Sequence, residues 1–128
     1  MSSENLKRAV SSSLNQDEVK VLEILAFLYI NLGYLDKAEK TVNAILVVEP
    51  SNIWAVFAFA VISFKKGDYN TTVVLIDKLL KKKSIKFNVI ELKKLKARCL
   101  FRLHKKDEAI EIMRTILEEV SSEKKDNQ

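Results

Sequence analysis

A period of 34 residues constrains the fold of this chain more than any other feature of its sequence. The two glycines, Gly33 and Gly67, are 34 positions apart (67 minus 33), and the same offset places Ala26 on Ala60. Each glycine follows one run of apolar residues at helical spacing and precedes another. We therefore predict that each glycine ends a helix in the left-handed conformation. A period of this length with two helices per unit is typical of a helical repeat protein.

A third unit is visible in the sequence although it lacks the glycine. It reads FRLHKKDEAIEIMRTILEE, and His104 falls where Gly33 and Gly67 fall in the first two units. Histidine is among the residues that tolerate the left-handed conformation, so we expect His104 to adopt it. The offset from the second unit is 37 (104 minus 67), which places an insertion of three residues in the connection 81–87.

Small residues recur at one spacing in all three units. Three pairs are each 12 positions apart: Ala26 and Ala38, Ala60 and Thr72, and Ala97 and Ala109. Two helices approach closely only where their side chains are small. The pairs therefore predict where the two helices of each unit cross.

The boundaries of the helices follow from local chemistry. The first unit predicts helices over about 17–31 and 36–48, and Pro50 cannot continue the second of them. Side chains that accept hydrogen bonds from a helix N-terminus stand before three of the expected helices. They are Asn15, Ser51 or Asn52, and Asp68.

The segment LYINLGYLDKAEKTVNAILVVEPSN resembles a tetratricopeptide repeat, with Gly33, Ala38 and Pro50 on positions characteristic of that family. The resemblance implies an all-α fold of three helix-turn-helix hairpins, stacked as a short right-handed superhelix (an α-solenoid). The repeats would span about 19–52, 53–86 and 90–120. An N-terminal segment or short helix over 1–18 would precede them, and a disordered tail over 121–128 would follow.

In arrays of this family the first helix of each pair lines the concave surface, so the resemblance implies a groove built from those helices. Eight residues are predicted to hold a partner there: Phe27, Ile30, Trp54, Phe57, Val61, Phe64, Arg98 and Phe101. The helix IWAVFAFAVISF is apolar on nearly all sides, and such a helix has to be covered on every side. The alternative that these aromatic residues belong to the core stays open at the level of sequence.

We therefore expect a non-enzymatic adaptor or chaperone that holds an amphipathic helix of a protein partner. The chain is similar to the small chaperones of bacterial type III secretion, which hold a needle subunit by its C-terminal helix and work with a small helical co-chaperone. Two alternatives stay open. One is an assembly scaffold or homo-oligomerisation module, and the other is a module that binds nucleic acid or an acidic partner through the basic third repeat.

Composition narrows the classes of function. One His and one Cys cannot supply the usual ligands of a metal site, and no phosphate-binding or nucleophile motif is present. We therefore expect no catalytic residue, no metal and no cofactor. Cys99 is expected to be a small buried side chain. The net charge of +5 is modest, and the basic residues of the third unit are expected to form a solvated helix face, which makes nucleic acid the weaker alternative.

The expected location follows from what the sequence lacks. The first residues have no continuous apolar core of the kind a signal peptide needs. The longest apolar stretch, 53–64, is too short to span a bilayer. We expect a soluble, cytoplasmic protein that does not bind a membrane.

Overall fold

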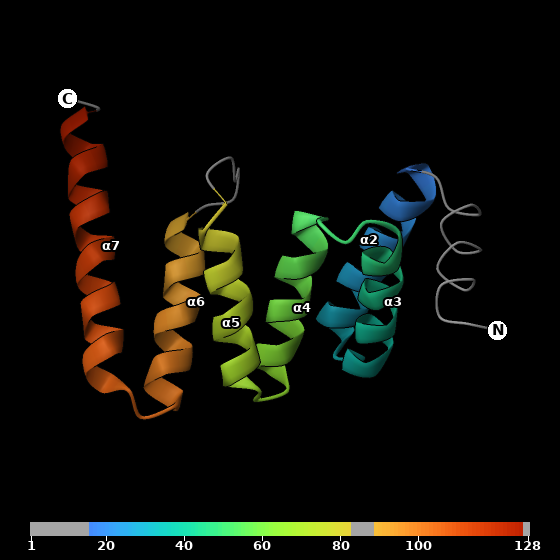
Figure 1. The fold of residues 1–128 in the computed structure, drawn as a ribbon, viewed down its shortest axis with the longest axis horizontal. Helices are drawn as coiled ribbons and strands as arrows, with labels where there is room; N and C mark the ends of the chain where they lie inside the picture. Colours follow the sequence, from blue (N-terminus) through green and yellow to red (C-terminus); the bar gives the residue numbers. More distant parts are fainter. Residues whose placement is uncertain (1–15, 83–88, 127–128) are drawn as a thin grey trace. The chain divides into compact units, whose positions relative to one another are not determined.

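The structure of the chain, a computed structural model, describes residues 16–82 and 89–126. These residues form six α-helices and no strand (Figure 1), which confirms the predicted all-α class. The helices are α2 (Gln16–Leu32), α3 (Leu35–Val48), α4 (Ile53–Lys65), α5 (Tyr69–Leu80), α6 (Val89–Arg102) and α7 (Lys106–Asp126). The helices α2 and α3 begin and end within one residue of the bounds predicted for them. None of the described helices is long and apolar enough to cross a membrane.

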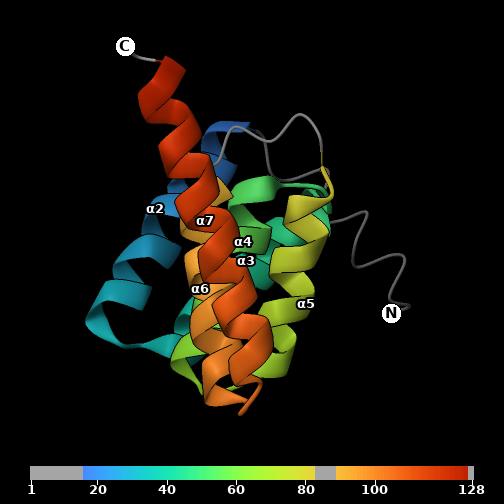
Figure 2. The ribbon, with the colours of Figure 1, turned by 90° about the vertical axis from the view of Figure 1, so that its left-hand side faces the viewer.

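The chain divides into two compact units, residues 1–66 and 67–128, each of which is described by itself. In the first unit, α3 packs against both α2 and α4, and α2 also contacts α4. In the second unit, α6 packs against both α5 and α7. Figure 2 shows α7 in front of α6, with the two helices running side by side.

All three predicted turns have the left-handed backbone. The φ angles are +82° at Gly33, +84° at Gly67 and +62° at His104. The turn at Gly33 is closed by the Tyr34 amide, which donates to the Tyr29 carbonyl at 2.9 Å. An amide in the equivalent position closes the turn at His104, at 2.8 Å. The prediction that His104 replaces a glycine is therefore confirmed.

Two of the predicted N-terminal caps are present. The side chain of Asn52, rather than that of Ser51, accepts a hydrogen bond from the Ala55 amide at 2.9 Å at the start of α4. The side chain of Asp68 accepts one from the Thr71 amide at 3.2 Å at the start of α5. The third predicted cap, Asn15, lies outside the described residues, and so does most of the predicted insertion.

The core of the first unit is built from small and branched side chains on all three of its helices. Its buried members are Val19, Ala26, Ala38, Val42, Ile45, Ala55, Ala58 and Ile62. Ala26 and Ala38 are fully buried where α2 packs on α3. In the second unit Ala97 and Ala109, on α6 and α7, are 4% and 6% exposed. Close helix packing thus coincides with small side chains in both hairpins.

The last helix is longer than expected. The sequence predicted a disordered tail from Ser121, whereas α7 is 21 residues long and continues through Asp126. The reason is local, because no glycine or proline follows Ser121, and glutamate and lysine are good helix formers.

Candidate functional site

Six of the eight predicted partner-binding residues lie on α2 and α4 of the first unit. They are Phe27 and Ile30 on α2, and Trp54, Phe57, Val61 and Phe64 on α4. We call this set the α2–α4 surface. The four residues on α4 are spaced by three, four and three positions, so they share one side of the helix.

A hydrogen bond fixes the side of α2 that borders α4. The Asn52 side chain, which caps α4, donates from Nδ2 to Glu23 Oε1 at 3.0 Å. Glu23 lies one helical turn before Phe27, on the same side of α2. Both α2 and α4 pack against α3 through short turns and therefore run in the same direction. Phe27 therefore shares the side of α2 that Glu23 joins to the start of α4.

The α2–α4 surface is partly open to solvent. Phe27 is 56% exposed, and the other five residues are intermediate between buried and exposed. Ile30 and Trp54 also pack against the core of the unit. On another side of α4, Val56 and Ile62 are buried. The helix thus has a covered side and a half-open side, and the half-open side carries three aromatic residues.

The remaining two predicted residues, Arg98 and Phe101, lie on α6 in the second unit. Both are exposed, and Phe101 is 63% exposed. They are three positions apart and share one side of the helix.

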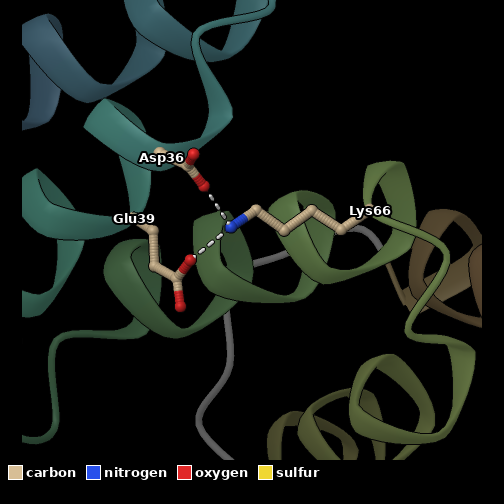
Figure 3. Close-up of polar contacts among 3 residues, drawn as sticks. All are labelled: Asp36, Glu39 and Lys66. Atoms are coloured by element: carbon tan, nitrogen blue, oxygen red, sulfur yellow. Dashed lines mark hydrogen bonds and ion pairs between the residues drawn. The ribbon is translucent and has the colours of Figure 1, made fainter.

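An ion-pair network ties α4 to the start of α3. Lys66, directly after α4, donates from Nζ to Asp36 Oδ1 at 2.8 Å and to Glu39 Oε2 at 2.5 Å. Figure 3 shows the ammonium group between the two carboxylates. The hydrogen bond from Lys66 lowers the pKa of Asp36 below its ordinary value, and the bonds to Asp36 and Glu39 raise the pKa of Lys66. Asp36 and Lys66 are therefore both charged near neutral pH, close to the Phe64 end of the α2–α4 surface.

Several lysines of α6 form ion pairs that the sequence analysis did not predict. Three of its lysines pair with carboxylates of the same unit: Lys93 with Glu119, Lys94 with Glu91, and Lys96 with Asp77. The side chains of Lys93 and Lys96 are only 22% and 24% exposed. The expectation that Lys93 and Lys96 belong to a solvated helix face was therefore wrong, because each pairs with a carboxylate on a neighbouring helix.

Cys99 is buried in the second unit, as its apolar surroundings in the sequence predicted. Burial raises the pKa of its thiol, and a hydrogen bond with Thr72 offsets part of that effect. A raised pKa keeps the thiol protonated near neutral pH, so it is a poor nucleophile. Among the residues that the structure describes, no three His, Cys, Asp or Glu side chains gather as a metal site would require.

Sequence reasoning missed two exposed aliphatic stripes. The first consists of Val21, Ile24, Leu28 and Leu32 on α2, and the second of Ile110, Met113 and Leu117 on α7. The sequence held a signal for the first stripe. The α2 segment VKVLEILAFLYINL has apolar residues on three sides of the helix, whereas the core and the α2–α4 surface account for only two.

Comparison with models of known protein families gives a match. A family model described as anaphase-promoting complex, cyclosome, subunit 3 matches residues 31–116. The matched span begins near the end of α2 and ends within α7, so it includes all of α3, α4, α5 and α6. The comparison with curated proteins finds no match.

Proposed function

The chain belongs to the family of the anaphase-promoting complex, cyclosome, subunit 3, whose repeats are of the tetratricopeptide type, and from this premise we propose that its α2–α4 surface holds an amphipathic helix of a partner protein. Repeats of this type are protein–protein interaction modules. The proposal assigns that general role to one surface of the first unit.

One observation carries the proposal. An exposed phenylalanine, Phe27, lies on the side of α2 that is hydrogen-bonded to the start of α4, and α4 carries a half-open row of apolar side chains that includes Phe57 and Phe64. A row spaced by three and four positions fits the apolar side of a guest helix, whose anchors recur at the same spacing. Aromatic side chains also contribute more contact area than other residues in such interfaces.

Two further contacts are proposed on the second unit. Phe101 would add an apolar contact, and Arg98 would pair with an acidic residue of the partner. They are tested separately from the α2–α4 surface, by variants on α6 alone.

The finer role that we propose is that of an adaptor or chaperone, similar to the type III secretion chaperones that hold a needle subunit together with a small helical co-chaperone. The rival role is an assembly scaffold or homo-oligomer. Mass measurement of the purified complex separates the two roles. A single small helical guest at equal stoichiometry supports the chaperone, and a stable homo-oligomer without a guest supports the scaffold.

Binding of a protein helix is favoured over nucleic acid by the charges of the third repeat. Lys93, Lys94 and Lys96 each pair with a carboxylate of the same unit. Lysines paired in this way release fewer counterions from a phosphate backbone than free lysines do.

The test uses a photo-crosslinking amino acid at position 27 of the full chain in its native cells. We expect the crosslink to form with a segment whose apolar residues recur at spacings of three and four. Phe27→Asp should weaken binding of a synthetic peptide of that segment at least tenfold, and Phe57→Asp should abolish it, because a charge would be desolvated against the guest.

The matched control is Val74→Asp, which introduces the same charge at a valine of α5 that is 66% exposed. It should bind the peptide as the native chain does, and circular dichroism should show unchanged helicity in all three variants. Equal affinity of the Phe27→Asp and Val74→Asp variants would exclude the α2–α4 surface as the site.

A further inference from the structure

The five basic side chains of α6 divide into two groups according to the side of the helix on which they lie. Lys93 and Lys96 lie toward neighbouring helices, since they pair with carboxylates of α7 and α5. The remaining three are exposed, and each lies four positions from the next: Lys94, Arg98 and Arg102. We call these three residues the basic row of α6.

The spacing of four positions places the basic row along one side of the helix. Successive members are about 6 Å apart along the helix axis, and the whole row is about 12 Å long. Phe101, which is 63% exposed, lies one turn after Arg98 and borders the row. The exposed side of α6 thus combines positive charge with an apolar contact.

The basic row is unfavourable for the chain by itself, because like charges four positions apart destabilise a helix. Glu91 offsets the charge of Lys94, with which it pairs at 3.2 Å. The helix dipole favours Arg102 in the last turn of α6. Neither effect accounts for the position of Arg98 between two other cations. An anionic partner converts this repulsion into attraction.

The charge of α7 indicates which kind of anion fits the row. This helix packs against α6 and carries seven acidic and four basic side chains, a net charge of −3 (4 minus 7). A nucleic acid extends its phosphates well past a row about 12 Å long, so the acidic residues of α7 repel it. A protein helix can confine its carboxylates to the side that contacts α6. The row therefore fits an acidic protein helix better than a nucleic acid.

We propose that the basic row and Phe101 bind a partner helix that carries two acidic side chains four positions apart, with an apolar residue beside them. The proposal rests on the contacts proposed above for Arg98 and Phe101, and it specifies the chemistry of the partner. The two carboxylates pair with the guanidinium groups of Arg98 and Arg102, which bind carboxylates through two parallel hydrogen bonds. The spacings match, because four positions of either helix rise about 6 Å. The apolar residue packs on Phe101.

The test begins with selection from a phage-displayed library of helical peptides, using the full chain as the target. The target carries Phe27→Asp, which weakens the α2–α4 surface, so failure of this selection leaves the proposal for that surface intact. We expect the selected peptides to be enriched in pairs of Asp or Glu four positions apart, beside an apolar residue. Selected peptides without such pairs, or no selected peptide, would overturn the proposal.

A pair of charge-matched variants shows whether the arginines are the contact. Arg98→Gln with Arg102→Gln removes two charges from the row, and Lys78→Gln with Lys81→Gln removes two charges from exposed lysines at the end of α5. A synthetic peptide with the selected acidic pair should bind the arginine variant at least tenfold more weakly than the native chain and the lysine variant within twofold, by fluorescence anisotropy at 0.1 M NaCl. Equal affinity of the two variants would exclude the basic row as the site.

A single-stranded oligothymidylate is the second probe, because it carries phosphates without carboxylates. The native chain should bind the acidic peptide more tightly than this oligonucleotide at 0.1 M NaCl. Circular dichroism should show unchanged helicity in both double variants. Tighter binding of the oligonucleotide, lost in the arginine variant, would assign the row to a nucleic acid and overturn the proposal.

Discussion

His104 is the one described residue other than glycine with a left-handed backbone, and its φ of +62° reproduces the turn at Gly33. The left-handed conformation costs a residue with a Cβ atom on the order of 1 kcal/mol. We expect His104→Gly to raise the free energy of unfolding by about 0.5–1 kcal/mol, after allowing for the greater freedom of glycine in the unfolded chain. Urea denaturation followed by circular dichroism measures this change.

Replacing Gly33 by a residue with a Cβ atom is the control, because it tests the cost of a left-handed backbone in the opposite direction. A Cβ atom built on Gly33 meets no other atom within 4 Å, so alanine there would be strained only by the backbone. Gly33→Ala should therefore destabilise the chain by about 1 kcal/mol, and Gly33→Asn by less, because asparagine tolerates this conformation. An unchanged stability of His104→Gly would contradict the strain assigned to the third turn.

At the scale of elements, Lys66 links the end of α4 to Asp36 and Glu39 at the start of α3. The pKa of Asp36 is lowered, so its contribution to stability is present above its ordinary pKa and is lost as pH falls through the lowered value. The pKa of Lys66 is raised, so its contribution is present below its ordinary pKa and is lost as pH rises through the raised value.

We therefore expect Lys66→Gln to lower the melting temperature between about pH 4 and pH 10, by no more than a few degrees, since exposed ion pairs contribute little. The difference from the native chain should shrink toward pH 2. The neighbouring exposed residue Lys65 provides the matched control, Lys65→Gln. A difference that stays constant down to pH 2 would show that Lys66 acts through packing rather than through its charge.

At the scale of the whole molecule, the net charge of +5 could attract an acidic partner, but the contact proposed on the α2–α4 surface is apolar. We expect the affinity for the synthetic peptide of the segment identified by crosslinking to change less than threefold between 0.1 and 0.5 M NaCl. Burial of apolar surface is only weakly sensitive to salt. Isothermal titration calorimetry measures the affinity. A phosphate-binding protein would lose affinity by orders of magnitude over that range, so a loss of that size would favour the charged alternative.

The sequence predicted those features of the fold that arise from local chemistry. Gly33 and His104 end helices because few residues adopt a positive φ, and Asn52 begins α4 because its side chain can accept from a free amide. Neither feature depends on distant parts of the chain.

The features that could not be predicted depend on what lies opposite a side chain. Lys93 looks solvent-exposed in the sequence, yet it pairs with Glu119 on the next helix. Val21 and Phe27 are both apolar residues of one helix. Only the packing of α2 against α3 and α4 distinguishes the exposed stripe that contains Val21 from the α2–α4 surface that contains Phe27.

Cys99 provides a practical tool. It is the sole thiol of the chain, it is buried, and its raised pKa slows its reaction at neutral pH. The rate at which a thiol reagent labels the native protein therefore measures how often the second unit opens, and the first unit contributes no signal. The same protection allows a fluorophore to be attached to an introduced surface cysteine while Cys99 stays in place.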